Sequence, residues 1–208
     1  MHKLTICRHP LVQDKLACLR DKKTSPQEFR RRMSELSSLM AYQVLGTLKT
    51  QIAKVSTPLQ AASCQVLAQP VVFVAVLRAG IGLLEGLLHV APEAKVGYIG
   101  LYRNEETLNP VRYYIRLPKG LNKSYVVLVD PMLATGGSAA EAVQILKSYG
   151  AKQISFLCLI AARAGVRRMA QAHPDVPVFT AGVDATLNRK GYIVPGLGDA
   201  GDRLFGTF

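Results

Sequence analysis

Apolar residues follow two patterns along the chain. Five short runs, rich in β-branched side chains, have the length and composition of strands buried on both faces of a parallel sheet. These runs span 71–77, 96–101, 125–129, 153–162 and 176–181. Between them, apolar residues recur at helical spacing over 83–89, 138–149 and 166–172. Because strands and helices alternate without a repeat, the pattern predicts an α/β fold, with one domain over 1–208 and a parallel sheet flanked by helices.

The first quarter of the chain predicts a helical segment over about 1–50. Residues 25–28, Ser-Pro-Gln-Glu, form a capping box with proline at the first helical position. An apolar stripe follows at helical spacing, formed by Phe29, Met33, Leu36, Leu39, Met40, Val44 and Leu48. Three arginines, 30–32, lie in the first turns, where the helix dipole does not favour cations. Two interpretations stay open for them, a solvated helix face and a surface that binds an anion or a partner.

Two segments depart from this alternation. Residues 51–69 are polar and weakly patterned, so they predict one strand or one short helix. A polar loop follows the strand at 96–101, and side chains of opposite character alternate over 111–117. This alternation predicts a hairpin arm, about 102–118, that extends from the sheet as a hood. Arg103, at the base of the arm, would then lie over a bound anion.

A central stretch has the arrangement of a phosphate site. The strand at 125–129 ends in Asp130, and a turn with two glycines, 134–138, leads into a helix. Ser138 and Glu141 predict a capping box at the start of that helix, and Gly150 predicts its end. Glycines let the backbone approach a ligand closely, and free N–H groups at the positive end of a helix dipole attract phosphate. The stretch therefore predicts a phosphorylated substrate.

Two further positions suggest ligand contacts. Arg78 ends a buried strand, at the carboxyl edge where open α/β sheets bind ligands; a structural ion pair is the alternative. Residues 188–201, NRKGYIVPGLGDAG, place many glycines around Asp199, which indicates backbone groups against a flat polar ligand; a plain surface loop is the alternative. The GxGxxG match at 196–201 lacks the βαβ unit of a dinucleotide site, and the central turn lacks the Lys-Ser/Thr of a nucleoside-triphosphate loop.

Composition and charge limit the kinds of partner that this protein is expected to bind. The 208 residues are 49% hydrophobic, which excludes a disordered chain, and the net charge of +12 favours anionic partners. No nucleic-acid motif accompanies the charge, so nucleic acid is not an expected partner. The four cysteines lack metal-ligand spacing, and no apolar run has the length of a signal peptide or membrane span. We therefore expect a cytoplasmic protein with no membrane partner and no structural zinc.

Four motifs in this order resemble the uracil phosphoribosyltransferase family of type I phosphoribosyltransferases. They are Leu-Arg-Ala-Gly at 77–80, Tyr-Arg-Asn-Glu-Glu-Thr at 102–107, Asp-Pro-Met-Leu-Ala-Thr-Gly-Gly-Ser at 130–138 and GYIVPGLGDAGD at 191–202. The resemblance covers nearly the whole chain and implies a type I phosphoribosyltransferase-like fold with a hood. It further implies that uracil and 5-phospho-α-D-ribose 1-diphosphate (PRPP) give UMP and diphosphate. Mg²⁺ would be carried in on PRPP, with no direct protein ligand.

The resemblance also implies roles for individual residues. PRPP would contact Arg78, Arg103, Asp130, Pro131, Met132, Leu133, Ala134, Thr135, Gly136, Gly137, Ser138 and Asp199; uracil would contact Ile193, Gly198, Asp199 and Ala200. Asp130 would bind the ribose hydroxyls, residues 134–138 the 5′-phosphate, and the two arginines the diphosphate. Arg103, Asp130 and Asp199 are the implied catalytic residues. Asp199 would contact Mg²⁺ through water or help with the uracil N1 proton, and both roles stay open.

Fixed guanidinium groups fit this chemistry, because negative charge builds on the departing diphosphate. A GTP effector and a homodimer or higher homo-oligomer are further implications of the resemblance. The chain departs from the family pattern at several positions, among them Gln51, Glu85 and Arg163. Two alternatives stay open. One is a pyrimidine-responsive RNA-binding regulator on the same fold, which Pro131 opposes; the other is a catalytically inactive, nucleotide-sensing subunit, which the departures support.

Overall fold

The computed structural model describes residues 4–103 and 110–207, apart from the side chains of Arg103 and Pro110. Its main sheet contains β1 (Leu4–Ile6), β4 (Val71–Leu77), β5 (Lys95–Arg103), β6 (Pro110–Arg116), β7 (Tyr125–Val129), β8 (Met132–Leu133), β9 (Gln153–Ala162) and β10 (Val178–Asp184). The strand order is β1-β10-β9-β7-β4-β5-β6, with β8 paired to β9. All pairs are parallel except β5–β6. The predicted, mostly parallel α/β sheet is confirmed.

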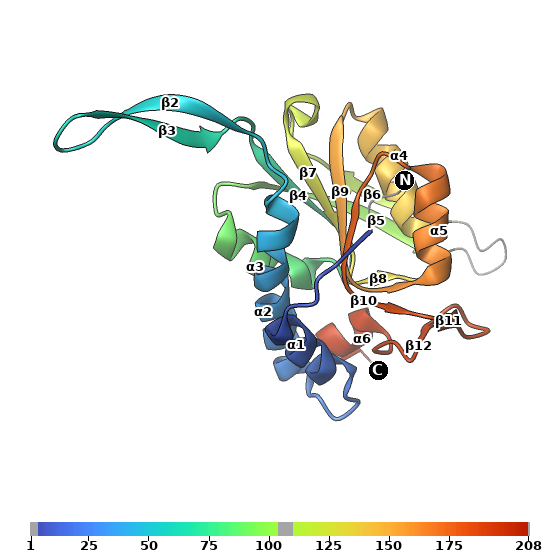
Figure 1. The fold of residues 1–208 in the computed structure, drawn as a ribbon. Helices are drawn as coiled ribbons and strands as arrows, with labels where there is room; N and C mark the ends of the chain where they lie inside the picture. The colour runs from blue at the N-terminus through green and yellow to red at the C-terminus, as the bar shows by residue number, and fades with distance from the viewer. Residues whose placement is uncertain (1–3, 104–109, 208) are drawn as a thin grey trace.

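Helices cover both faces of this sheet (Figure 1). On one face lie α1 (Pro10–Arg20), α2 (Pro26–Leu45), α3 (Ile81–Val90) and α6 (Ala200–Phe205); on the other lie α4 (Gly137–Ser148) and α5 (Arg163–Ala172). Alternate residues of the central strands enter the two cores, Phe73 and Val127 the first, Val72 and Val126 the second. Burial on both faces explains why these strands are continuous apolar runs. In the described residues, no helix has the length and apolar character needed to cross a bilayer.

Residues 50–67 form a two-stranded antiparallel ribbon, β2 (Thr50–Ser56) and β3 (Ala61–Leu67), which projects from the body (Figure 1). The prediction of one strand or one short helix was therefore wrong. The hairpin turn contains no glycine; it is closed by Thr57 Oγ1, which accepts hydrogen bonds from the Leu59 and Gln60 N–H groups at 3.2 and 3.1 Å. A turn closed by a threonine side chain gives a weaker sequence signal than a glycine turn.

The N-terminal segment is helical as predicted, with the added edge strand β1 that its three residues did not predict. Ser25 caps α2 by accepting a hydrogen bond from the Glu28 N–H at 3.3 Å. The arginines at 30–32 find partners within the chain: two pair with Glu28 and Glu35, and the first donates to the Leu204 carbonyl at 2.7 Å. Their positions thus have a structural explanation.

Helix α4 begins differently from the prediction. The N-cap is Gly136, with φ +79°, which has no side chain to cap the helix; the Gly137 N–H instead donates to Thr135 Oγ1 at 3.4 Å. The proposed capping box at Ser138 was therefore wrong, and Glu141 instead pairs with Arg112 of β6. Gly150, with φ +87°, follows the end of the helix as predicted. Apart from this long Gly137 bond, the first N–H groups of α4 are available to a ligand.

Short elements complete the chain. A 3₁₀ turn, η1 (Leu121–Lys123), precedes β7, and β11 (Thr186–Leu187) pairs antiparallel with β12 (Ile193–Val194). The predicted hairpin of the hood is confirmed in β5 and β6, but β6 stays in the main sheet as its edge strand. The connecting loop, 104–109, lies outside the described residues.

Candidate active site

The carboxyl edge of the sheet brings three segments together. Arg78 follows β4 and Asp130 follows β7, and these strands are parallel neighbours. The C-terminal loop, residues 188–202, meets them there. A cavity of about 210 Å³ is lined by all three segments, through Ala79, Met132, Ala134, Gly191, Tyr192, Ile193, Gly198, Asp199, Ala200 and Gly201. All four predicted uracil-binding positions, Ile193, Gly198, Asp199 and Ala200, are among these residues, so the fold gathers the predicted PRPP and base segments around one space.

The glycine loop, residues 130–138, is held by backbone contacts. Within it, β8 pairs with Ile160 and Ala161 of β9, and the Pro131 carbonyl accepts a hydrogen bond from the Leu159 N–H at 2.9 Å. The start of α5 packs directly behind the loop: a Cβ at Gly165 would lie 2.6 Å from the Leu133 carbonyl oxygen. Only glycine allows this approach without a shift of the backbone.

Asp130 is half-buried beside this loop, and its Oδ1 accepts a hydrogen bond from the Met132 N–H at 3.3 Å. Burial raises the pKa of Asp130 to about 7, although the Met132 N–H acts in the opposite direction. A ligand that donates hydrogen bonds to the carboxylate would favour its ionised form. Asp130 is therefore suited to bind hydroxyl groups at neutral pH.

Arg78 lies between the strand end and the C-terminal loop. Its Nη2 is 3.5 Å from Asp202 Oδ1, and its guanidinium lies 5.8 Å from the centre of the Phe205 ring. The Arg78 side chain is 58% exposed, and such a long, exposed ion pair contributes little to stability. The alternative interpretation of Arg78 as a structural ion pair is thus weak, and the guanidinium stays accessible to an anion.

Asp199 is the fixed acid of the C-terminal loop. Its Oδ1 accepts hydrogen bonds from the N–H groups of Gly201 and Asp202 at 2.9 and 3.0 Å, which caps α6. Its Oδ2 accepts one from the Tyr192 hydroxyl at 3.3 Å. The negative charge of Asp199 raises the pKa of Tyr192. Tyr192 thereby helps to orient the carboxylate, a role that the sequence did not indicate.

Two residues that sequence analysis missed hold the C-terminal loop. Arg20 donates from Nη1 and Nη2 to the Asp184 carboxylate, each at 2.8 Å, and from Nη1 to the Gly196 carbonyl at 2.8 Å. The Gly196 N–H donates back to Asp184 at 2.9 Å. Burial opposes ionisation of Asp184, but the Arg20 and Gly196 hydrogen bonds outweigh it, so the pKa of Asp184 is lowered. We call this group the Arg20–Asp184 clamp.

Arg203 adds a second attachment. Its guanidinium donates to the carbonyls of Leu19, Leu197 and Asp21 and lies 4.5 Å from the centre of the Phe29 ring. No short motif links these residues, because they are far apart in sequence. One signal was available: Asp184 lies three residues after the predicted strand at 176–181 and ends β10, and an acid at that edge suggests a role at the site.

Other predicted positions lie elsewhere or outside the described residues. Arg103 ends β5 beside β4, on the same edge as Arg78, but its side chain is not described. Gln51 lies on the projecting ribbon and Glu85 on α3, whereas Arg163 begins α5 behind the glycine loop. In the described residues, no three His, Cys, Asp or Glu side chains form a group that could hold a metal ion.

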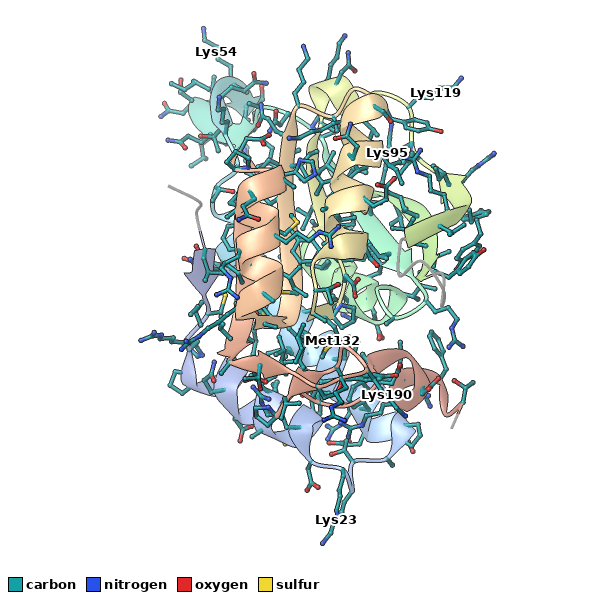
Figure 2. The ribbon with its side chains drawn as sticks, turned by 90° about the vertical axis from the view of Figure 1, so that its right-hand side faces the viewer. Lys23, Lys54, Lys95, Lys119, Met132 and Lys190 are labelled. Carbon is teal, nitrogen blue, oxygen red and sulfur yellow. The ribbon has the colours of Figure 1, made fainter. Side chains whose placement is uncertain are left out.

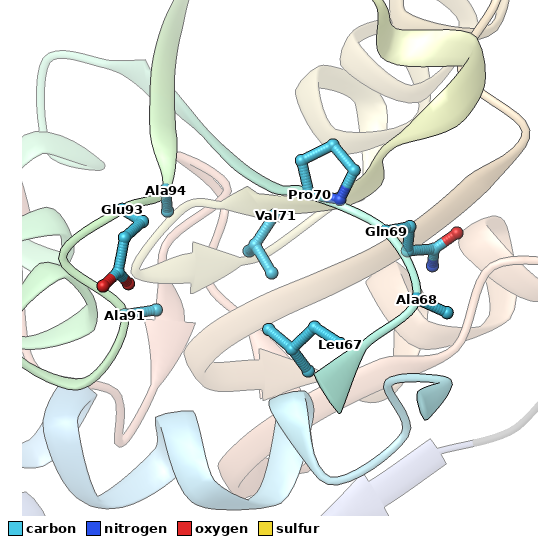
Figure 3. Close-up of a pocket in the computed structure, with 8 residues that line it drawn as sticks. All are labelled: Leu67, Ala68, Gln69, Pro70, Val71, Ala91, Glu93 and Ala94. Carbon is cyan, nitrogen blue, oxygen red and sulfur yellow. The ribbon is translucent and has the colours of Figure 1, made fainter. Parts of the chain in front are cut away.

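The other end of the molecule offers a different kind of cavity. A cavity of about 410 Å³ lies at the base of the ribbon, near the amino end of β4 (Figure 3). Its one charged lining residue is Glu93, which would repel an anionic substrate. Lysine side chains lie at both ends of the molecule, Lys54 and Lys119 toward one end and Lys23 at the other (Figure 2).

Comparisons with known proteins agree with the four motifs. The family model for uracil phosphoribosyltransferase matches residues 6–207. The chain is 52% identical over 208 residues to the uracil phosphoribosyltransferase of Sinorhizobium fredii, covering 100% of both chains. It is 55% identical over 200 residues to that of Dictyoglomus turgidum, covering 96% of this chain and 97% of the relative.

Solved structures support the fold. A protein from Aquifex aeolicus superposes with a TM-score of 0.92 at 39% identity, covering 97% of each chain. A hypoxanthine-guanine phosphoribosyltransferase from Bacillus anthracis has a TM-score of 0.52 at 12% identity, covering 76% of this chain and 80% of that one, which shows a shared fold alone. With the described parts of its motifs gathered at one edge of the sheet and nearly its whole length matched, the chain belongs to the uracil phosphoribosyltransferase family.

Proposed function

We propose that this protein transfers the phosphoribosyl group of PRPP to uracil, releasing UMP and diphosphate. The observation that carries the proposal is the single cavity to which the glycine loop, the β4 end and the C-terminal loop all contribute. A phosphate site, a cationic side chain and a loop for a flat polar ligand are the parts that this reaction needs. The relatives named uracil phosphoribosyltransferase support the same activity.

The glycine loop fits the phosphoribosyl part of PRPP. The start of α4, whose N-cap glycine has no side chain, offers N–H groups and the positive end of a helix dipole, so Ala134, Thr135, Gly136, Gly137 and Ser138 would surround the 5′-phosphate. The preceding residues, Pro131, Met132 and Leu133, are held against β9 and would pass beside the ribose. Asp130 would accept hydrogen bonds from the ribose hydroxyls.

The two arginines fit the leaving group. Breaking the bond between ribose C1 and oxygen moves negative charge onto diphosphate, and a guanidinium fixed in place binds that charge more strongly as it develops. Arg78 is accessible at the carboxyl end of β4. Arg103 ends the neighbouring strand β5, so it would approach the same group from the hood.

The C-terminal loop would select the base. Ile193 is buried in β12 and borders the cavity with Gly198, Asp199 and Ala200. Uracil presents C4=O beside N3–H, and cytosine reverses both groups. Backbone donors and acceptors placed for uracil would leave both groups of cytosine unpaired, at about 1 to 3 kcal/mol each, which gives discrimination of roughly a thousandfold.

Mg²⁺ fits this site as part of the substrate complex. Asp199 Oδ2 accepts a single hydrogen bond, so it has a free lone pair for a metal-bound water. Mg²⁺ is commonly held by one or two carboxylates together with substrate phosphates, and it would neutralise diphosphate charge when bound. Acceptance of the uracil N1 proton is the other role for Asp199.

Three further expectations stay predictions: a GTP effector, a homodimer or higher homo-oligomer, and a cytoplasmic location. The projecting ribbon supports assembly, because Ile52 and Leu59 are 77% and 95% exposed there. An isolated two-stranded hairpin is marginally stable in water, so a second chain over this ribbon would stabilise it.

The decisive experiment follows radiolabelled uracil with PRPP, with and without Mg²⁺. We expect UMP only with uracil, PRPP and the divalent cation together, and cytosine as the matched poor substrate. PRPP binding without UMP formation would favour the inactive nucleotide-sensing subunit. Submicromolar, sequence-selective RNA binding at physiological salt in place of turnover would favour the regulator.

A further inference from the structure

Helix α5 is strongly basic. Its ten residues, RAGVRRMAQA, contain Arg163, Arg167 and Arg168 and no acid. Within the part of the chain that the structure describes, no carboxylate forms an ion pair with any of these three side chains. Elsewhere in the described residues, arginines with nearby acids are paired, as Arg112 is with Glu141. The unpaired charge of α5 therefore needs an explanation.

One of the three arginines lies against the glycine loop. A Cβ at Gly137, the first residue of α4, would be 3.6 Å from Arg168 Nη1 and 3.8 Å from Arg168 Cζ. The same point is 3.7 Å from Thr135 Oγ1. Because a Cβ in a helix points toward the helix N-terminus, this point borders the space in front of α4. The guanidinium and the threonine hydroxyl thus flank one small volume at the helix start.

The backbone fixes this placement. Gly165 lies three residues before Arg168, so both are on one face of α5, and the glycine packs against the carbonyls of Leu133 and Ala134. Arg168 Cβ would in turn lie 3.1 Å from a Cβ at Gly136. Helix α5 and the loop therefore form one packed unit, and Arg168 stays beside the loop wherever the guanidinium rotates.

A cation at this place is unfavourable without an anion. The N-terminal end of α4 carries partial positive charge; its N-cap, Gly136, has no side chain, and the one side-chain contact there is the 3.4 Å hydrogen bond from the Gly137 N–H to the neutral Thr135 Oγ1. Arg168 brings a full positive charge to the same end. Glu141 lines a cavity of about 440 Å³ together with Arg168 and Gly137, yet it pairs with Arg112. Repulsion between the guanidinium and the helix start would be relieved by a phosphate group between them.

We propose that Arg168 is a further substrate-binding residue, which contacts the 5′-phosphate of the phosphoribosyl substrate from the α5 side. This inference rests on the proposed function, because it names an additional ligand for the same phosphate. The backbone N–H groups of the loop bind that phosphate from one side, and the guanidinium supplies a charge-assisted hydrogen bond from another. Recognition would then combine backbone geometry with one mobile, permanently charged side chain.

The test uses titration calorimetry with ribose 5-phosphate, which carries the phosphate without the diphosphate or the base. Arg168→Gln should weaken binding about ten- to a hundredfold, the scale of one hydrogen bond to a charged group. Arg167→Gln is the matched control: both residues are exposed, and it removes the same charge from the adjacent position about 100° around the helix, so it should change the affinity less than about twofold. Arg168→Lys should fall between them, because lysine keeps the charge without the planar fork.

Steady-state kinetics complete the test. For Arg168→Gln the KM for PRPP should rise by more than kcat falls, and the KM for uracil should be unchanged. Equal losses in Arg167→Gln would assign the effect to general surface charge and overturn the inference. Wild-type ribose 5-phosphate affinity in Arg168→Gln would also overturn it. If Arg168→Gln does not fold, Arg168→Lys with wild-type ribose 5-phosphate affinity and an unchanged KM for PRPP counts against the inference.

The two proposals fail in different ways. Wild-type protein that binds ribose 5-phosphate through Arg168 but forms no UMP would refute the proposed function and leave the phosphate contact standing. Wild-type protein that forms UMP, with Arg168→Gln unaffected in every measurement, would refute the contact alone.

Discussion

The glycine loop and the C-terminal loop face one cavity but are held in opposite ways. The glycine loop is held by its own backbone: β8 pairs with β9, and the loop carbonyls pack on Gly165. The C-terminal loop is held by side-chain contacts between distant parts of the chain: Arg20 reaches the Gly196 carbonyl, and Arg203, directly after the loop, reaches the Leu19 carbonyl. One loop is a local structure, and the other depends on the assembled fold.

This difference corresponds to what each loop would bind. A phosphate group is recognised by a fixed cup of N–H groups, which a short stretch of backbone can form by itself. A pyrimidine edge requires donors and acceptors at set positions over several ångströms, so the loop must be placed accurately relative to the sheet. The side-chain contacts of Arg20 and Arg203 provide that placement. The position of the loop therefore depends on residues far from it in sequence.

The largest effect should come from Arg78, where the two regions meet. Arg78→Gln removes a cation that neither loop can replace, so kcat/KM should fall by about 2 to 4 kcal/mol in transition-state stabilisation, or roughly thirty- to a thousandfold. Arg116→Gln is the control. Arg116 is also an exposed arginine, but it lies at the far end of β6, opposite Tyr98 of β5 in the strand register. Steady-state kinetics with varied PRPP measure both; equal rates in the two variants would show that Arg78 is only a surface charge.

Adding one methyl group at Gly165 should displace the glycine loop. In Gly165→Ala the new Cβ would lie 2.6 and 2.7 Å from the Leu133 and Ala134 carbonyl oxygens, so the loop must move. A displacement of this size should cost about a hundredfold in kcat/KM for PRPP. Thermal unfolding serves as the folding control. Wild-type ribose 5-phosphate affinity in this variant would show that the loop adapts, contrary to the comparison.

Sequence predicted the glycine loop well because the information is contiguous. A buried strand, an acid, two glycines and a helix occur in consecutive residues, and the strand at Tyr125–Val129 has the predicted bounds. The error lay in the cap: Ser138 and Glu141 have capping-box spacing, but the helix starts after Gly136 and the carboxylate pairs with Arg112. Spacing alone cannot show that a nearby arginine will engage that carboxylate.

The clamp and the ribbon were not predictable in the same way. Arg20 and Asp184 are 164 residues apart in sequence, and they meet because α1 packs beside β10. Most residues of β2 and β3 are exposed, and the alternation in β3 is only between exposed and half-buried side chains, so the apolar pattern is weak. Sequence patterns therefore miss the clamp, which depends on tertiary contacts, and the ribbon, which makes few of them.

The clamp gives the third prediction. Arg20→Gln removes the charge that holds Asp184 and the Gly196 carbonyl, so the C-terminal loop should loosen and the KM for uracil should rise by about tenfold. Ribose 5-phosphate affinity should not change, because the glycine loop is independent of this contact. Arg31→Gln, an exposed arginine paired with Glu28, is the control and should leave both values unchanged. Parallel losses in uracil and ribose 5-phosphate binding would mean that the two loops are coupled.

The smallest effect near neutral pH should come from Asp130. Its pKa is raised to about 7 in the free protein, and hydrogen bonds from ribose hydroxyls need the ionised form. The kcat/KM for PRPP should therefore fall about twofold from pH 8 to pH 7 and approach a tenfold fall per pH unit below pH 6. Asp130→Asn, which cannot ionise, should be slow and should lose this slope.

Stability should change with pH in the opposite direction. Because the folded-state pKa of Asp130 lies above the ordinary value of 3.8, the folded protein holds a proton that the unfolded chain has released between that value and about 7. The contribution of Asp130 to the free energy of unfolding should thus fall as the pH rises through this window, while PRPP binding improves over its upper part. Denaturant unfolding of wild type and Asp130→Asn across the window measures the difference. If wild type gained stability relative to Asp130→Asn as the pH rose, burial would not be the dominant influence on this carboxyl, and the glycine loop would contain an acid that is ionised before the substrate arrives.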